Sequence, residues 1–117
     1  MSVADLPRKD QIVCFLYGAI ALIALPATWI NNIAFMRTSG DPSPLAFVRA
    51  AYANFAAASL TNDVLLVAIA AGVFMVIEGR RVGIRFIWAY VILSALIAIS
   101  VTFPLFLIAR QLKLAKR

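Results

Sequence analysis

Few side chains in this sequence could carry out chemistry, and those nearest the apolar segments are carboxylates. Asp63 and Glu78 flank an uncharged run of 14 residues, from Val64 to Ile77. A helix over this run places the two carboxylates at opposite ends, so they cannot act as a general acid–base pair. The chain has no histidine, and its single cysteine, Cys14, lies in an apolar run. Cys14 is therefore expected to be a small buried hydrophobe.

The sequence also lacks the local motifs of several enzyme classes. It contains no His-Glu-x-x-His, no nucleophile elbow, no Walker loop and no Gly-x-Gly-x-x-Gly. We therefore predict that the protein is not an enzyme and has no metal site. The sequence names no cofactor.

The composition is typical of a membrane protein. Hydrophobic residues make up 64% of the 117 residues and charged residues 14%, whereas a typical soluble domain has about 25% charged residues. The net charge of +6 comes from basic residues at the expected helix ends, which indicates membrane topology and lipid headgroups. No basic stripe is interleaved with aromatic residues, so nucleic acid is not expected as a partner.

The apolar runs predict an all-α integral membrane protein with a single membrane domain over residues 1–117. We expect three transmembrane helices over about 11–36, 57–79 and 84–110, and a short interfacial amphipathic helix over 44–54 between the first and the second. Phe86 to Ala109 alone has 24 uncharged residues, or roughly 36 Å of helix. A cleaved signal peptide is less favoured for the first run, because its apolar residues continue beyond Pro26.

Prolines and small residues predict bends and contacts within these helices. Pro26 predicts a kink near residues 22–26, and Pro104 predicts a bend because it frees the Ser100 carbonyl. Ala68 and Gly72 form a small-xxx-small pair suited to close helix contact. Ser94, Ala98 and Thr102 form a small-residue stripe with a spacing of four.

The residues between the second and third expected helices form a basic elbow, Glu78-Gly79-Arg80-Arg81-Val82-Gly83-Ile84-Arg85. Glu78 is unfavourable at a helix C-terminus, so we expect Arg80 and Arg81 to compensate its charge, with Glu78 and Arg81 forming a local ion pair. Asp63 has two interpretations. It is either a carboxylate in the first turn at the membrane surface or a buried ionisable group that needs a partner.

With three crossings, polar residues from all helices gather on one side of the membrane. Asp63 could then meet Arg110 or Arg37. The gathering predicts either a hydrogen-bonded helix interface or a small pocket for a ligand or partner. The residues concerned are Asn31, Asn32, Asn54, Asn62, Asp63, Ser100, Thr102 and Arg110.

Orientation is nearly undetermined on this topology. One side carries five basic residues and the other six, and the dense elbow favours a cytoplasmic N-terminus only weakly. The protein is expected in the cell membrane, crossing it several times, as in a bacterial inner membrane.

From Asn54 onward the sequence resembles a family of small bacterial membrane proteins catalogued as a domain of unknown function. The resemblance implies a three-helix membrane protein without an established activity. The family often has glycine where Ala98 stands and an acid where Gln111 stands. The matching residues are Asn54, Asp63-Val64-Leu65, Glu78-Gly79-Arg80-Arg81, Trp88, Phe103-Pro104-Leu105-Phe106-Leu107 and Arg110.

These features favour one of two functions. The favoured function is an accessory or structural subunit that packs on a larger membrane complex, because small residues are frequent and reactive groups are few. The alternative is a small-molecule or lipid binder, or a carrier, that uses a polar and aromatic pocket near Asp63. The expected partners are the lipid bilayer and other membrane protein subunits or further copies of the chain.

Overall fold

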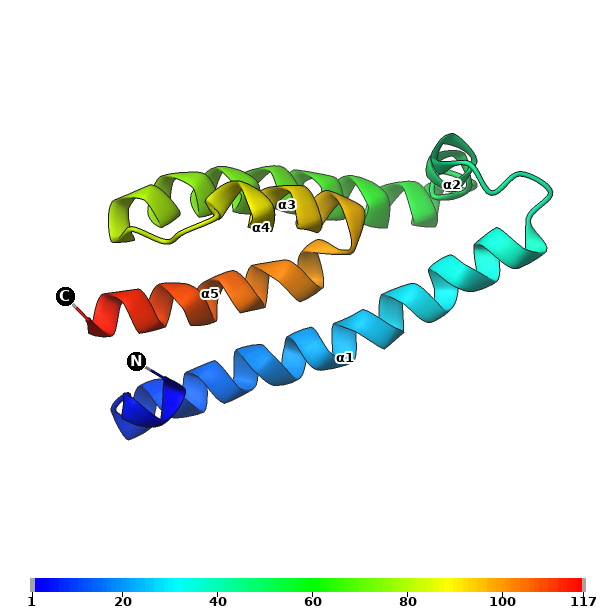
Figure 1. Ribbon diagram of the computed structural model, residues 1–117. Coiled ribbons are helices and arrows are strands. Elements are labelled where there is room, and N and C mark those ends of the chain that lie inside the picture. The colour runs from blue at the N-terminus through cyan, green and yellow to red at the C-terminus, as the bar shows by residue number, and fades with distance from the viewer. Residues whose placement is uncertain (1, 117) are drawn as a thin grey trace.

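The computed structural model describes residues 2–116, and these residues form an all-α fold without strands (Figure 1). Two of the helices, α1 and α3, are long and apolar enough to cross a membrane. The molecule is elongated, with extents of 50 × 24 × 24 Å. In order, the elements are η1 (Val3–Asp5), α1 (Arg8–Thr38), α2 (Pro44–Ala50), α3 (Phe55–Val82), α4 (Ile87–Leu96) and α5 (Ile99–Ala115).

Helix α1 is continuous through Pro26 and extends the predicted 11–36 by a few residues at each end. The Thr28 hydroxyl donates to the Ala24 carbonyl at 2.8 Å and to the Leu25 carbonyl at 3.2 Å, within the turn that contains the proline. Such side-chain hydrogen bonds to the backbone satisfy groups that water cannot reach in an apolar environment.

Helix α2 begins as predicted and ends earlier. The Ser43 hydroxyl caps it by accepting from the Ala46 N–H at 3.2 Å, and Pro44 occupies the first turn. The helix stops at Ala50 rather than at residue 54, because Asn54 is the N-cap of α3 and accepts from the Ala57 N–H at 2.8 Å. A residue that caps one helix has extended backbone and cannot continue another.

The loop before α2 is held by its own polar groups. The Ser43 N–H donates to an Asp41 carboxylate oxygen at 3.0 Å. The hydrogen bonds from Ser43 lower the pKa of the Asp41 carboxyl, since they favour its charged form.

Helix α3 ends in a turn that needs glycine. Gly83 has φ of 80°, in the left-handed region, and the Ile84 N–H reaches back to the Gly79 carbonyl at 2.8 Å. This arrangement satisfies carbonyls that the end of a helix leaves without partners. Phe86 then adopts φ of 59° just before α4, so the chain reverses direction within four residues.

The predicted third transmembrane helix over 84–110 is wrong. Helix α4 ends at Leu96, Ala98 has extended backbone, and α5 begins at Ile99. Figure 1 shows α4 running beside α3 and α5 turning back toward the elbow. The described chain therefore has two helices suited to cross a membrane and a helical hairpin, α4–α5, instead of three crossings.

The break between α4 and α5 is held by side chains from three segments. The Trp29 indole N–H of α1 donates to the Ile97 carbonyl at 3.0 Å. The hydroxyls of Ser94 and Thr102 share a hydrogen bond across the hairpin. Ser94, Ala98 and Thr102 are therefore not one helix stripe as predicted. Pro104 lies inside α5, and the chain breaks before the bend predicted at Ser100.

The core lies where α3, α4 and α5 meet at the elbow end. Met75 and Phe106 are fully buried, and Ile87 packs against them. Phe74 and Tyr90 contact the Phe106 ring edge-on, with ring centroids 6.0 and 5.8 Å away. Aromatic pairs in this geometry add to the stabilisation that burial gives.

Candidate functional site

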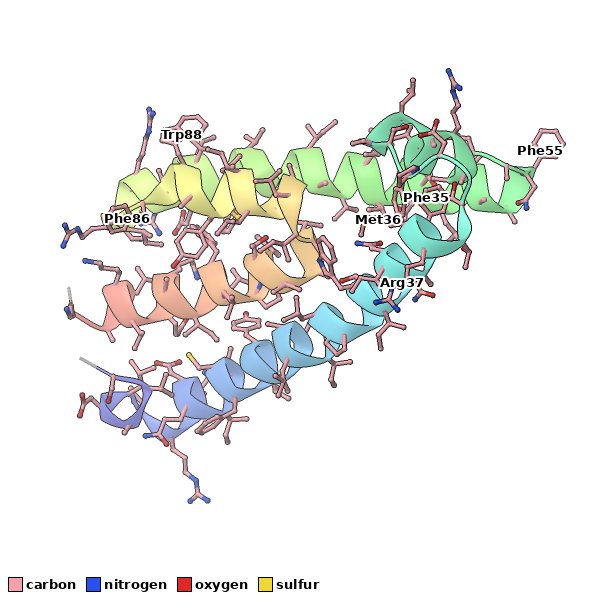
Figure 2. The ribbon with its side chains drawn as sticks, turned by 45° about the vertical axis from the view of Figure 1, so that its right-hand side comes forward. Phe35, Met36, Arg37, Phe55, Phe86 and Trp88 are labelled. Carbon is pink, nitrogen blue, oxygen red and sulfur yellow. The ribbon has the colours of Figure 1, made fainter. Side chains whose placement is uncertain are left out.

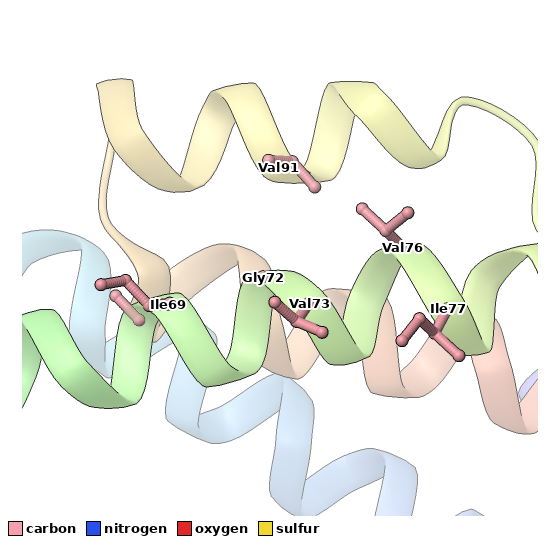
Figure 3. Close-up of a pocket in the computed structure, with 7 residues that line it drawn as sticks. Ile69, Gly72, Val73, Val76, Ile77 and Val91 are labelled. Atoms are coloured by element: carbon pink, nitrogen blue, oxygen red, sulfur yellow. The ribbon is translucent and has the colours of Figure 1, made fainter.

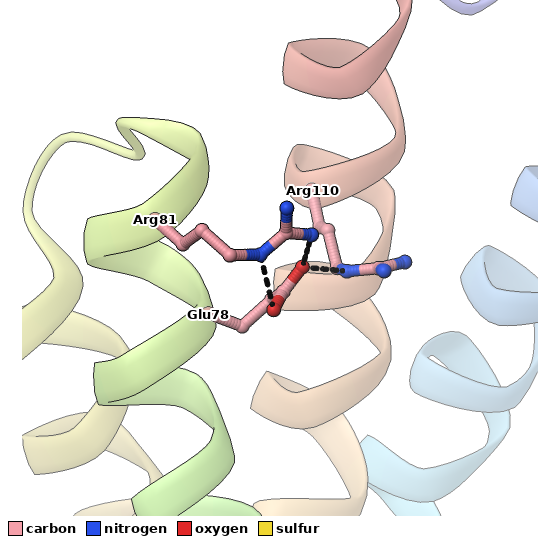
Figure 4. Close-up of polar contacts among 3 residues, drawn as sticks. All are labelled: Glu78, Arg81 and Arg110. Atoms are coloured by element: carbon pink, nitrogen blue, oxygen red, sulfur yellow. Dashed lines mark hydrogen bonds and ion pairs between the residues drawn. The ribbon is translucent and has the colours of Figure 1, made fainter.

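The most highly connected polar site is an ion cluster of Glu78, Arg81 and Arg110, which we call the Glu78 cluster (Figure 4). The Arg81 Nε donates to Glu78 Oε2 at 3.0 Å, and its Nη2 donates to Oε1. The Arg110 Nε donates to the same Oε1 at 2.9 Å. The structure contains the expected Glu78–Arg81 pair, and Arg110 from α5 is the third member. Arg80, which was also expected to compensate Glu78, forms no ion pair within residues 2–116 and lies over the Trp88 ring instead.

The elements explain why this cluster forms. Glu78 lies in the last turns of α3, where the helix dipole disfavours a negative charge and two guanidinium groups offset it. Arg110 reaches Glu78 because α5 turns back toward the end of α3. Its guanidinium also lies over the Phe74 ring, 5.9 Å from the centroid.

The geometry of the Glu78 cluster favours a structural role. The Glu78 side chain is only 11% exposed, and both of its carboxylate oxygens accept hydrogen bonds from guanidinium groups. A carboxylate bonded in this way has little capacity left for a substrate. The cluster instead fixes the end of α5 against the end of α3.

The Arg110 contact corrects a sequence-based prediction. With three crossings, either Arg110 or Arg37 could have met Asp63, but α5 carries Arg110 to Glu78. The sequence held a signal for this pair, because Glu78 needs compensation and Arg110 is the first charged residue after Arg85. That signal was outweighed by the long uncharged run, which predicts one continuous helix.

Asp63 lies about two turns inside α3, because that helix begins at Phe55. Its side chain is exposed, and it forms no ion pair with Arg37 or any other cation of residues 2–116. Asp63 therefore does not lie in the first turn, as the surface interpretation required. The partner that the buried interpretation required is not found within residues 2–116.

The other polar residues that were predicted to lie together are instead found at separate positions, several of them in local hydrogen bonds. Asn31 donates to the Ala27 carbonyl of its own helix at 2.9 Å. Asn62 accepts from the Tyr52 hydroxyl at 2.8 Å, which ties the segment after α2 to α3. Of the remaining residues, Asn32 is half-buried, Asn54 caps α3, Ser100 is exposed in the first turn of α5, and Thr102 bonds to Ser94 in the hairpin.

A shallow apolar groove runs along α3 beside α4, with a volume of about 440 Å³ (Figure 3). It contains Ala68 and Gly72, the small pair that predicts close helix contact. A Cβ atom placed on Gly72 would meet nothing within 4 Å, so no part of the described chain fills this position. The groove is lined by Ala68, Ile69, Gly72, Val73, Val76, Ile77 and Val91.

The donor groups of the described residues do not form a metal site. Within residues 2–116, no three histidine, cysteine, aspartate or glutamate side chains come together in a way that could hold an ion. The carboxylates nearest the apolar segments, Asp63 and Glu78, lie 15 residues apart on α3, or about 22 Å along the helix.

Comparison with known proteins identifies a family. A family model described as "Protein of unknown function DUF2834" matches residues 16–112, which include the whole Glu78 cluster and most of α1. The match confirms the predicted resemblance to a family of unknown function. No curated protein and no solved structure matches the chain.

Proposed function

We propose a membrane topology and a role for this chain, which belongs to the DUF2834 family. The topology has two crossings, α1 and α3, and a hairpin, α4–α5, that enters and leaves the membrane on the same side. The observation that carries it is the exposure of apolar side chains. Only 11% of the most apolar 18-residue window of α1, and 11% of that of α3, is buried within the protein.

This exposure argues against a water-soluble helical protein. The core helix of a soluble protein hides its apolar face against neighbouring elements. Here Leu22, Ile23 and Leu66 are 75%, 67% and 68% exposed, although they lie near the middle of the two long helices. A hydrocarbon environment covers such side chains, whereas water does not.

The helix lengths support two crossings and a hairpin. Helix α1 has 31 residues and α3 has 28, or about 46 and 42 Å at 1.5 Å per residue, enough to span a hydrocarbon core of about 30 Å. Helix α4 has 10 residues, or about 15 Å, and reaches roughly halfway. Irregular backbone at that depth is tolerated where protein satisfies it, as Trp29 does at Ile97.

The hairpin also changes the charge balance. With α5 returning, the basic residues of the described chain concentrate at the elbow end, and Arg37 and Arg49 alone lie at the other. The positive-inside rule then favours the elbow end, with the start of α1 and the end of α5, on the cytoplasmic side. The basic residues at the elbow end are Arg8, Lys9, Arg80, Arg81, Arg85, Arg110, Lys113 and Lys116.

Cysteine labelling tests this topology. In a Cys14→Ala background, single cysteines replace Ala4, Gly40 or Ala115, and intact cells are treated with a membrane-impermeant maleimide. Two crossings and a hairpin predict that only the Gly40 position reacts before the cells are opened. Reaction at both Gly40 and Ala115 would instead support three crossings.

Within the membrane, we propose that the chain is an accessory subunit that packs on a helix of another membrane protein. The α3 groove supports this role, because Ala68 and Gly72 let a second helix approach closely. Within the described residues, nothing lies within 4 Å of a Cβ atom placed on Gly72. The scarcity of reactive side chains outside the Glu78 cluster supports it as well.

Cross-linking tests the accessory role. In the Cys14→Ala background, Gly72→Cys presents a thiol in the groove, and Leu22→Cys presents one on the exposed face of α1. An accessory subunit predicts one discrete cross-linked product with a different chain in native membranes from Gly72→Cys alone. A product that contains only this chain would indicate self-assembly, and a lone monomer in mild detergent would count against both.

A further inference from the structure

A second concave surface, which we call the basic crevice, lies at the elbow end. It is formed by the segment that joins α3 to α4, by the first turn of α4 and by the last turns of α5. Its volume is about 310 Å³, and its lining residues are Ile84, Arg85, Phe86, Tyr90, Ala109, Leu112, Lys113 and Lys116.

The crevice has an excess of positive charge. Arg85, Lys113 and Lys116 line it, and no carboxylate does. The nearest acidic group along the chain, Glu78, already accepts from Arg81 and Arg110. None of the three lining cations forms an ion pair within residues 2–116, so their charge remains for an outside anion.

The walls of the crevice are apolar and aromatic. Phe86 is 75% exposed, and its ring lies 5.3 Å from the Arg85 guanidinium carbon. Nearby Trp88 is 53% exposed, with the Arg80 guanidinium 5.9 Å from its ring (Figure 2 shows both aromatic side chains at this end). Aromatic side chains beside cations are typical of the headgroup level of a membrane.

We propose that the basic crevice binds the phosphate group of an anionic membrane lipid. Lysine and arginine side chains bind the phosphate, and the apolar walls contact the first carbons of the lipid tails. A free phosphate ion uses the same cations but gains nothing from the walls, so the combination favours a lipid. This inference rests on the proposed membrane insertion.

Lipid retention tests the proposal. The full chain is purified from nanodiscs that contain equal amounts of phosphatidylglycerol and phosphatidylcholine, and the lipid that stays bound in detergent is measured by native mass spectrometry. We expect retention of phosphatidylglycerol over phosphatidylcholine on the order of tenfold. The triple variant R85Q/K113Q/K116Q loses this preference.

Two further variants separate a built site from general surface charge. R8Q/K9Q/R80Q removes the same amount of charge at the same end of the molecule and should keep the preference for phosphatidylglycerol. Ala109→Phe fills the crevice and keeps every charge, and it should lose that preference. The proposal is overturned if the two triple variants lose the lipid preference equally, or if Ala109→Phe retains it. Displacement of the lipid by excess inorganic phosphate also overturns it, because the crevice would then hold a free anion.

Failure of this proposal can be distinguished from failure of the membrane topology. Carbonate extraction reports whether the chain is inserted, independently of bound lipid. A chain that resists extraction but shows no lipid preference contradicts the crevice alone. A chain that is extracted contradicts the topology, and with it the lipid site.

Discussion

The two ends of the molecule differ in how much structure the chain provides for itself. At the elbow end, α3, α4 and α5 enclose Met75 and Phe106 completely, and the Glu78 cluster joins α3 to α5. At the far end, no residue between positions 22 and 70 is buried. The elbow end is therefore specified by contacts within the chain, whereas the far end depends on local caps and on whatever surrounds it.

The local contacts at the far end hold turns rather than a core. The Phe35 and Phe47 rings meet edge-on at 5.2 Å, and the Thr61 hydroxyl donates to the Ala51 carbonyl at 2.7 Å. These contacts fix how α2 joins its neighbours. They leave the outer faces of α1 and α3 uncovered by the described chain, as the proposed accessory role requires.

The largest effect expected from this comparison is at Phe106. Phe106→Ala removes a fully buried ring at the elbow end and should lower the free energy of unfolding by about 3–5 kcal/mol. Phe55→Ala removes a ring that is 95% exposed at the far end and should change it little. Denaturant titration of both variants in detergent measures the difference. Similar losses would show that the two ends are equally packed.

Removal of the Glu78 charge should give the next largest loss. Glu78→Gln leaves Arg81 and Arg110 without their carboxylate and weakens the link between α3 and α5. Asp63→Asn makes the same chemical change on the same helix, where the described chain offers no ion-pair partner, and should be nearly neutral. Thermal unfolding in detergent measures both variants.

A double-mutant cycle sharpens the assignment of the Glu78 cluster. If Glu78 and Arg110 act together, E78Q/R110Q loses less stability than the two single variants combined. Strictly additive losses would mean that the contact between α3 and α5 contributes nothing by itself. The elbow end would then depend on its apolar core alone.

Two glycines of α3 should respond in opposite directions. A Cβ on Gly79 would lie 2.2 Å from Ile87 Cδ1, so Gly79→Ala forces α4 away and should cost about 1–3 kcal/mol of unfolding free energy. Gly72→Ala meets open space in the groove and should stabilise the isolated chain by about 0.5–1 kcal/mol. Chemical denaturation of the monomer tests both signs. Destabilisation by Gly72→Ala would show that something already fills the groove.

Much of this architecture could be predicted from the sequence. Uncharged runs place α1 and α3, Ser43 and Pro44 mark the start of α2, and the spacing of Glu78 and Arg81 predicts their pair. Each of these features is local. A cap, a charge spacing or an apolar run acts within a few turns of the residues that form it.

The α4–α5 hairpin could not be predicted in the same way. A run that is apolar all round has no periodicity that distinguishes one 24-residue helix from two shorter ones. The break depends on groups that are distant in sequence. Trp29 of α1 donates to the Ile97 carbonyl at the turn, and Glu78 of α3 accepts from Arg110 of α5. One indirect sign was present. Three crossings divide the basic residues almost evenly, which membrane proteins disfavour, whereas the hairpin concentrates them at one end.

The turn of the hairpin offers the most local prediction. Trp29→Phe keeps an aromatic ring on α1 but removes the N–H that bonds to the Ile97 carbonyl, and should cost about 1 kcal/mol. Because the loss is confined to the turn, hydrogen exchange should quicken at the first amides of α5 and stay unchanged at Met75 in the core. Phe103→Leu is a suitable contrast, since Phe103 packs against the elbow core and its substitution removes no hydrogen-bond donor, so exchange should quicken at Met75 instead. Uniformly faster exchange in Trp29→Phe would mean that the hairpin turn and the elbow core unfold as one unit. The region that is stabilised by contacts within the chain would then reach from the elbow end to the hairpin turn.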